Sequence, residues 1–308
     1  CNIKKENVIE NLDADTIYDV PLMFEKQNVA EIIMKKLGLK ETKNDLNEWY
    51  KMCKNSKEIK KSVEIALVGK YISLKDAYIS IYESLNHAGN YNNVKVNIRW
   101  IDAEDLEKGD ANKILDGING LIVPGGFGKR GIEGKIKALK YARENNIPTL
   151  GICLGMQLMV VEFMRNVANI KDANSLEFDA KTKNPVINLM DDQIDVDKKG
   201  GTMRLGKYPC TLDANTLSYN AYGDNLIYER HRHRYEFNND YREIALKNGL
   251  VIAGTSPDNK LVEIVEIKKN KWAVGVQFHP EFKSRPNRPH PLFRELVKNA
   301  KEFKYENK

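Results

Sequence analysis

The chain has 308 residues, enough for one large core or two domains, and 42% of them are hydrophobic while 30% are charged. No run of eighteen apolar residues occurs, so we expect no membrane span. Because the first residues are polar, we expect no signal peptide. Because the sequence does not begin with Met, we expect the chain to be a piece of a longer protein. The net charge of +6 is typical of a solvated, lysine-rich surface and is compatible with an anionic partner such as a nucleotide.

The four cysteines, Cys1, Cys53, Cys153 and Cys210, are widely spaced and form no C-x-x-C pair. This spacing argues against a zinc site and against a disulfide framework. It favours a reducing compartment, and we therefore expect a cytoplasmic protein.

Residues 1–60 differ in composition from the rest of the chain. The stretch "VAEIIMKKLGL" (Val29–Leu39) has helical spacing and predicts a helix that stops near Gly38. The stretch "DLNEWYKMCKNSKEIKKS" predicts a second helix followed by a linker. Because this segment has too few apolar residues for a core of its own, we expect it to pack against a part that this chain lacks.

From Ser62 onward, short apolar runs alternate with amphipathic segments. The runs "VEIALVG", "VKVNIRWID", "GLIVPGG" and "IPTLGIC" predict strands. The segment from Asp76 to Gly89, "IEGKIKALKYARENN" and "LGMQLMVVEFMRNVA" predict helices between or after them. Strands separated by helices indicate βαβ units and a parallel sheet.

After about residue 175 the pattern becomes β-rich. We expect strands at "TMRLGKYPCTLD", "YERHRHRYEF", "LVIAGTS", "LVEIVEI" and "WAVGVQFH", and a final helix at "PLFRELVKNAKEF". The predicted fold is an α/β domain over residues 61–308. It has an open, mostly parallel sheet flanked by helices and a smaller antiparallel β portion in its C-terminal half.

Cys153 ends an apolar run and stands between Gly151 and Gly155. A strand that ends in a nucleophile and turns sharply into a helix is typical of a nucleophile elbow, whose flanking residues must be small. The adjacent helix N-terminus favours the thiolate form of a cysteine. The alternative is a buried structural cysteine in a tight turn.

A thiolate nucleophile needs a base and a group that orients the base. Of the five histidines, only His279 in "GVQFHPEF" directly follows an apolar strand and has a carboxylate close by, Glu281. Residues i and i+2 of an extended segment point to the same side, so this pair can act together. The alternative is an ordinary surface histidine at a strand end.

Five glycines lie in "PGGFGKRGIEGK", from Pro124 to Lys135. The spacing does not fit a G-x-x-x-x-G-K-[ST] phosphate loop or a G-x-G-x-x-G motif. Because glycine loops expose backbone N–H groups, we favour an oxyanion-binding loop.

Together, "PGGFG", "GICLGMQ" and "QFHPE" resemble the class I glutamine amidotransferases in order and spacing. The resemblance implies a flavodoxin-like fold that hydrolyses the side-chain amide of L-glutamine through a glutamyl thioester. It implies that Cys153 is the nucleophile, His279 the base and Glu281 the orienting group. It also implies that the remaining family positions contact glutamine: Gly126, Leu154, Gly155, Met156, Gln157, Glu177 and Arg234.

Longer strings, "ANSLEF", "GGTMRLG" and "ERHRHRYEFN" among them, are similar to the glutaminase half of the CTP synthase family, from about Val63 to Phe303. "VIENLDADTIYDVPLMFEKQNV" resembles the end of that family's synthetase domain, so residues 1–60 are predicted to be its remnant plus a linker. The resemblance implies that ammonia passes to a synthetase domain that uses ATP, Mg²⁺ and UTP, with no cofactor or metal in this chain.

The same resemblance implies GTP as an effector, near a loop that includes Arg130 and Glu133, and a homotetrameric full-length enzyme. Nucleic acid is not expected, because Arg230, Arg232 and Arg234 alternate without regular aromatic residues.

Three alternatives remain open: the amidotransferase of another synthetase such as GMP synthetase, a non-catalytic assembly module, and a cysteine peptidase or γ-glutamyl hydrolase. "GGTMRLG" and the N-terminal segment argue against the first, and the complete triad argues against the second. Glu177 and Arg234, which suit the ammonium and carboxylate of free glutamine, argue against the third.

Overall fold

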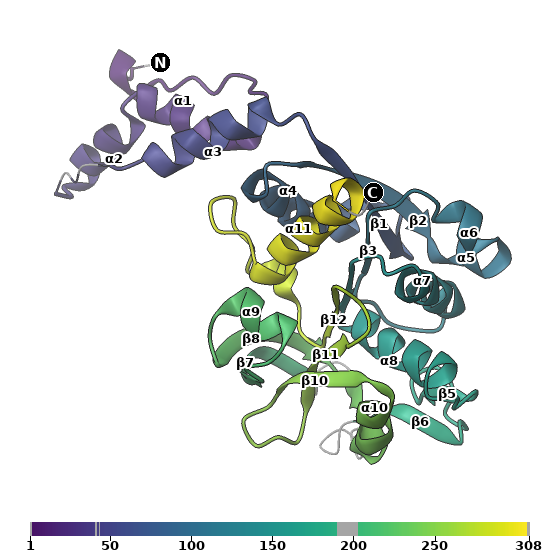
Figure 1. Cartoon of the computed structure of the whole chain (residues 1–308). Helices are drawn as coiled ribbons and strands as arrows, with labels where there is room; N and C mark the ends of the chain where they lie inside the picture. The colour runs from purple at the N-terminus through teal and green to yellow at the C-terminus, as the bar shows by residue number, and fades with distance from the viewer. Residues whose placement is uncertain (1, 41, 43, 190–202, 307–308) are drawn as a thin grey trace. The chain divides into compact units, whose positions relative to one another are not determined.

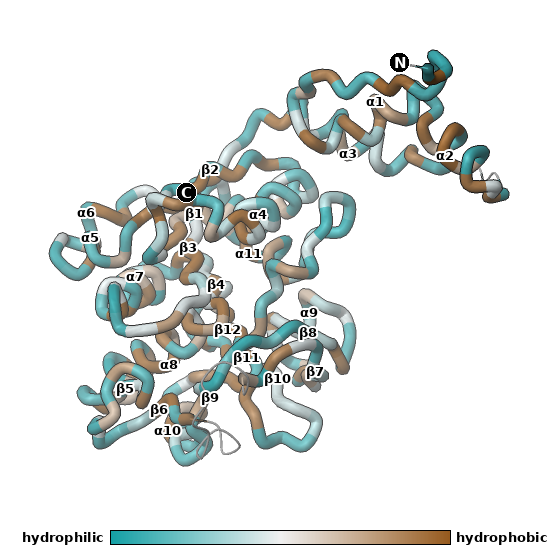
Figure 2. The backbone as a smooth tube through the Cα atoms, turned by 180° about the vertical axis from the view of Figure 1, so that it is seen from behind, coloured by the Kyte–Doolittle hydropathy of each residue, from teal (hydrophilic) through white to brown (hydrophobic). Residues whose placement is uncertain are grey.

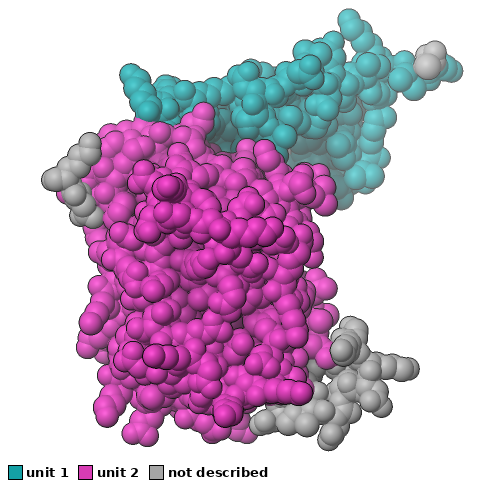
Figure 3. Space-filling model, turned by 90° about the vertical axis from the view of Figure 1, so that its right-hand side faces the viewer, with its two compact units in different colours: residues 1–60 teal, residues 61–308 magenta. Residues whose placement is uncertain are grey.

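The computed structural model describes residues 2–40, 42, 44–189 and 203–306 (Figure 1). The chain forms two compact units, Cys1–Lys60 and Lys61–Lys308, which Figure 3 colours separately. The boundary lies where the sequence changes to strand–helix alternation. Among the described residues, no helix is long and apolar enough to cross a membrane.

The first unit is helical. It contains the short 3-10 helices η1 (Lys5–Asn7) and η2 (Ile17–Asp19), followed by α1 (Val20–Lys26), α2 (Val29–Leu37) and α3 (Asn47–Glu58). α2 ends at Gly38, whose φ of 63° is a helix-ending conformation that favours glycine. In the described part of this unit only Leu22 and Cys53 are buried apolar side chains, in keeping with its low apolar content.

The second unit is built on a sheet with nine described strands, in the order β2-β1-β3-β4-β12-β11-β10-β7-β8. The first five run parallel: β2 (Lys95–Asp102), β1 (Ser62–Gly69), β3 (Gly120–Val123), β4 (Thr149–Ile152) and β12 (Ala273–Val276). The other four extend it antiparallel: β11 (Val262–Ile267), β10 (Leu250–Thr255), β7 (Arg204–Leu212) and β8 (Leu226–His233). A small second sheet contains β5 (Ala173–Ser175), β6 (Asn184–Leu189) and β9 (Tyr235–Phe237).

Helices cover both faces of the main sheet (Figure 1). One face carries α4 (Ile79–Tyr91), which follows η3 (Lys75–Tyr78), together with α9 (Leu217–Tyr222) and α11 (Pro291–Tyr305). The other carries α5 (Ala103–Lys108), α6 (Ala111–Ile114), α7 (Ile132–Glu144), α8 (Leu154–Asn166) and α10 (Arg242–Asn248). η5 (Asn239–Tyr241) precedes α10, and η6 (Pro280–Phe282) follows β12.

The period-two alternation of a strand explains how β1 serves both faces. Val63, Ile65 and Leu67 pack toward α4 and α11, while Ala66 and Val68 pack toward the other layer. Both sets are fully buried, so the sheet reads as continuous apolar runs, which Figure 2 shows in brown at its centre. The predicted α/β class and mostly parallel core sheet are confirmed.

Two sequence-based expectations need correction. The predicted strand "YERHRHRYEF" is two strands in different sheets, because the chain leaves β8 at His233 and β9 begins at Tyr235 to pair with β6. The helices α5 and α6 were not anticipated, because each is too short to show a clear period. The first three residues of "GGTMRLG" lie outside the described residues, and β7 begins at Arg204.

Candidate active site

Cys153 forms a strained turn between β4 and α8. Its φ of 52° and ψ of −104° are rare for a residue with a side chain. A Cβ on Gly155 would lie 2.0 Å from the Val123 carbonyl oxygen, and one on Gly151 would lie 2.7 Å from the Gly155 oxygen. The two flanking glycines therefore let the backbone turn in contact with β3, as the sequence predicts for a nucleophile elbow.

Cys153 is buried, with 4% of the residue exposed. Its backbone N–H donates to the Val276 carbonyl oxygen at 2.7 Å, which ties the turn to β12. Its sulfur lies 3.7 Å from the Arg232 carbonyl oxygen and 3.7 Å from the Gln277 Nε2. The side chain is thus held between β8 and the end of β12.

His279 and Glu281 form a close pair beside this thiol. The His279 Nδ1 and the Glu281 Oε1 are 2.8 Å apart, while the Nε2 has no hydrogen-bond partner among the described residues. Burial opposes the charged ring, but the Cys153 sulfur and the Glu281 carboxylate outweigh it and raise the pKa of His279 to about 10. The His279 N–H donates to the Arg230 carbonyl oxygen at 2.8 Å, so β8 also positions the base.

A cavity of about 220 Å³ unites these groups. Its lining includes Cys153, His279 and Glu281, together with Gly126 and Arg232. A second cavity of about 440 Å³ shares His279 and Arg232 with it. The first cavity is of the size that a small amino acid side chain needs, and it exposes the thiol and the imidazole together.

The glycine loop closes one side of the cavity. A Cβ on Gly125 would lie 3.0 Å from the His279 Cε1 and 3.5 Å from the Cys153 Cβ, so a side chain here would require the imidazole to shift by a few tenths of an ångström. The Lys70 amine fixes the loop by donating hydrogen bonds to the carbonyl oxygens of Phe127 and, at 2.9 Å, Gly128.

Besides Gly126, which lines the cavity, the residues predicted to contact glutamine lie in three places. The Glu177 Oε1 accepts from the Gly128 N–H at 2.8 Å, and burial raises the pKa of this carboxyl group. The Gln157 amide is turned into the core, where its Nε2 donates to Tyr235 O at 2.9 Å and Gln277 Oε1 at 3.1 Å. Leu154, Gly155 and Met156 are buried in the first turn of α8, and Arg234 follows the end of β8.

Arg130 and Glu133, the predicted effector-loop residues, are engaged in ion pairs. The Arg130 guanidinium lies 3.2 Å from Glu104 and donates to Lys70 O at 3.0 Å. Glu133 accepts two hydrogen bonds from Arg165, at 2.9 and 3.0 Å. Neither side chain lines the cavity beside Cys153.

Comparison with protein families matches residues 73–299 to the model described as glutamine amidotransferase class-I.

The chain belongs to the class I glutamine amidotransferases.

Residues 1–39 of this amidotransferase match a second model, described as CTP synthase N-terminus. Two relatives named CTP synthase, from Ruminiclostridium cellulolyticum and Clostridium acetobutylicum, are each 57% identical to it, over 304 and 300 residues. These alignments cover 99% and 97% of this chain but 57% and 56% of the relatives. The chain therefore spans little more than half the length of the relatives it matches.

Among solved structures, this amidotransferase resembles the glutaminase domain of Trypanosoma brucei CTPS with bound acivicin. The two are 39% identical with a TM-score of 0.73, covering 78% of this chain and 94% of that one.

Sequence reasoning missed two buried polar residues at this amidotransferase site. The Gln277 amide links Gln157 to the Cys153 sulfur and is fully buried. Lys135 is also fully buried, on the inner face of α7. A lysine on the apolar face of an amphipathic helix is a signal that the sequence contains, whereas nothing marks Gln277 apart from its place beside His279.

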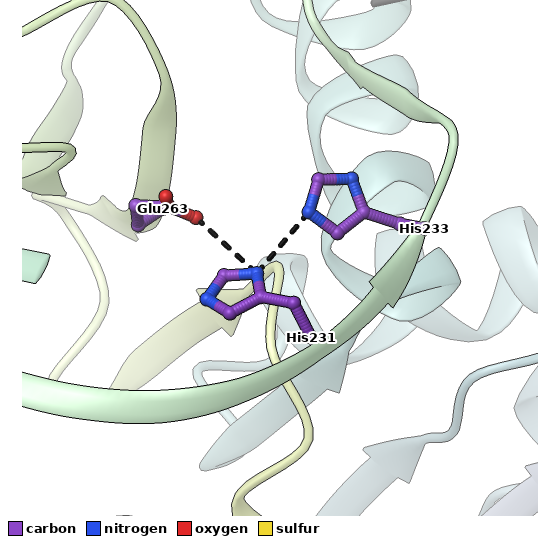
Figure 4. A group of neighbouring side chains, drawn as sticks. All are labelled: His231, His233 and Glu263. Atoms are coloured by element: carbon purple, nitrogen blue, oxygen red, sulfur yellow. Dashed lines mark hydrogen bonds and ion pairs between the residues drawn. The ribbon is translucent and has the colours of Figure 1, made fainter. Parts of the chain in front are cut away.

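Behind the site lies a polar cluster, in which His231, His233 and Glu263 point toward one another from β8 and β11 (Figure 4). The Arg204 Nη1 lies 2.6 Å from Glu263 Oε1, 3.4 Å from His231 Nδ1 and 3.5 Å from His233 Nε2. Burial, followed by the Arg204 charge, lowers the pKa of His231 to about 2 and that of His233 to about 3.

This donor set has the composition of a metal site. The Arg204 guanidinium, however, already contacts all three side chains and supplies a positive charge. The Gln277 N–H donates to Glu263 O at 2.8 Å, which connects the cluster to the strand end before His279. We therefore regard the cluster as a support for β8 and β12.

Proposed function

We propose that this chain hydrolyses L-glutamine through a glutamyl thioester on Cys153. The observation that carries the proposal is that Cys153, His279 and Glu281 meet at one cavity beside the glycine loop. The solved relative, a glutaminase domain with bound acivicin, supports the same chemistry.

In the first half of the proposed reaction, the Cys153 sulfur attacks the side-chain amide carbon of glutamine. The carbonyl electrons move to oxygen, and the backbone N–H groups of Gly126 and Leu154 stabilise the resulting negative charge. His279, which carries the thiol proton, gives it to the amide nitrogen, so the C–N bond breaks and ammonia leaves.

In the second half, His279 removes a proton from water, which attacks the thioester carbon. The C–S bond breaks, glutamate leaves, and Cys153 regains its proton. Glu281 accepts a hydrogen bond from the His279 Nδ1–H and stabilises the imidazolium form.

We assign the recognition of the two charged groups of glutamine to side chains of opposite charge. Arg234 would bind the α-carboxylate and Glu177 the α-ammonium, while Gln157, Gly155 and Met156 shape the helix turn beneath the substrate. The hydrogen bond from Gly128 to Glu177 supports this assignment, because it joins the carboxylate to the loop that lines the cavity.

For the whole protein we propose that the ammonia serves the ATP-dependent conversion of UTP to CTP, a step that uses Mg²⁺. We propose GTP as an effector that acts near Arg130 and Glu133. We also propose that the full-length enzyme is a homotetramer. The relatives named CTP synthase support this reading. Residues 1–60 would be the end of the synthetase domain and a linker. Their exposed apolar side chains suit a segment that packs within a larger domain: Ile3, Val8, Leu12, Ile17, Ile33, Leu37, Leu39 and Tyr50. The cytoplasmic location stays a prediction.

The test is covalent labelling with an electrophilic diazo-ketone analogue of glutamine, followed by peptide mass spectrometry. We expect a single adduct on Cys153 that excess glutamine prevents and that Cys153→Ala abolishes. Cys210 is an internal control, because burial raises the pKa of its thiol far above the usual range. Labelling that is scattered, or that glutamine does not prevent, would contradict the proposal.

A further inference from the structure

Lys135 is a buried amine inside a helix–sheet interface. It lies on α7 at the spacing of the apolar residues Ile132, Ile136 and Leu139, and it is 0% exposed. Among the described residues, its Nζ has no hydrogen-bond partner. A buried charge without a partner is expensive, so a position on this face would be filled more stably by an apolar side chain.

The Lys135 amine is directed at the back of the glycine loop. A Cβ on Gly126 would lie 3.9 Å from the Lys135 Nζ and 3.6 Å from the Leu154 Cδ2. Gly126 and Leu154 are the two residues whose N–H groups are assigned to the oxyanion. The amine therefore lies beside the backbone of Gly126, one of the two residues assigned to the oxyanion.

Holding the loop in place does not explain this lysine. The Lys70 amine already donates to the carbonyl oxygens of Phe127 and Gly128. Burial, followed by the Lys70 charge, lowers the pKa of Lys135 to about 7, while the Cys153 sulfur acts in the opposite direction. Lys135 therefore responds electrostatically to the charge on the Cys153 sulfur and makes no hydrogen bond that fixes the backbone.

We propose that Lys135 is a positioning residue that stabilises, from behind the glycine loop, the negative charge of the Cys153 thiolate as that charge passes to the glutamine carbonyl oxygen during reaction. The inference rests on the proposed glutaminase function. In the resting protein the Lys135 amine has no hydrogen-bond partner among the described residues, whereas the reacting state moves negative charge from the sulfur to the carbonyl oxygen beside the N–H groups of Gly126 and Leu154. An interaction that is stronger in the transition state than in the ground state accelerates the reaction.

The decisive variant is Lys135→Met, which keeps an unbranched chain one atom shorter and removes the charge, with Lys140→Met as a matched control. Lys140 is exposed on the same helix and lies 4.0 Å from Glu144. We expect Lys135→Met to lower the rate of Cys153 acylation by the diazo-ketone analogue roughly 10- to 100-fold. The glutamine concentration that protects against labelling should change less than twofold.

Thermal unfolding separates this role from packing. If Lys135 acts through its charge, Lys135→Met should raise the melting temperature while it slows acylation, because a buried amine is replaced by an apolar side chain. A higher melting temperature with an unchanged acylation rate would overturn the proposal. So would a loss of both stability and rate, which would identify Lys135 as a packing residue.

Alkylation of Cys153 by iodoacetamide keeps the test independent of glutamine. At pH 7 we expect Lys135→Met to slow this alkylation about tenfold, since the thiolate loses a nearby positive charge. If the wild-type chain reacts with iodoacetamide but not with the glutamine analogue, the proposed function fails and the charge effect can still be read. An alkylation rate that is unchanged in Lys135→Met would overturn the inference directly.

Discussion

The His279–Glu281 pair makes the base of this site depend on one carboxylate. Glu281→Gln keeps the shape of the side chain and removes its charge, so the pKa of His279 should fall and the ring can adopt the wrong tautomer. We expect glutamine turnover to fall by roughly 10²- to 10⁴-fold. Turnover assays and NMR titration of His279 measure the two effects, and Glu243→Gln, an exposed carboxylate on α10, should change neither. Equal losses in both variants would argue against the role of Glu281.

The same histidine predicts how stability depends on pH. Its pKa is about 10 in the folded chain against an ordinary value of 6.5, so the folded state binds the extra proton between these values. The stabilising contribution is complete below pH 6.5 and is lost as the pH rises through about 10. Denaturant unfolding at pH 6, 8 and 10 should therefore show a decline in wild type that is weaker in His279→Gln. A parallel decline in both would assign the effect to other groups.

The three triad residues were predictable from the sequence, whereas Gln277 was not. Cys153, His279 and Glu281 could be assigned because each follows a strand end with a recognisable spacing, and the structure brings them to one cavity. Gln277 could not, because its role comes from two side chains that lie 120 and 124 positions away in sequence.

The close packing of α7 against α5 depends on one glycine, Gly134. A Cβ on Gly134 would lie 1.8 Å from the Ala103 carbonyl oxygen, so α7 and α5 approach at backbone distance. We expect Gly134→Ala to lower the free energy of unfolding by about 2 kcal/mol or more, because α7 must move away. Helix propensity alone would instead favour alanine by about 1 kcal/mol, so the sign measured by denaturant unfolding decides.

Gly223→Ala is the control for this prediction. Gly223 ends α9 with a φ of 72° and has open space around its Cβ position, so alanine there should cost only about 1 kcal/mol. If Gly134→Ala were no worse than this control, the close approach of α7 and α5 would not matter for stability.

The strands β1 to β4 and the helices α4, α7 and α8 were predictable, since buried strands and amphipathic helices alternate there with clear periods. The division of residues 228–237 into β8 and β9 was not, because it depends on β6 and β7, which pair with them from other parts of the chain.

For the whole molecule, the two units differ sharply in what they bury. Both large apolar clusters belong to the second unit, while the first buries only Leu22 and Cys53 among its described residues. We therefore expect residues 61–308 alone to unfold cooperatively within about 3 °C of the full chain and to keep the reactive Cys153. Calorimetry and diazo-ketone labelling of the shortened chain test this.

Residues 1–60 alone are the complementary sample. With so small a core we expect no cooperative unfolding transition from them. A shortened chain, 61–308, that lost its transition would show that the first unit is needed for the stability of the second.

The contacts of Arg204 also bear on where the positive charge beside His231, His233 and Glu263 comes from. Two imidazoles and a carboxylate that lie within a few ångströms of one another can bind a metal ion, which a chelator can remove. Here the cation is encoded in the chain, so it is present as soon as β7 pairs with β8, at a fixed stoichiometry of one. The positive charge that these three side chains contact is therefore part of the polypeptide itself.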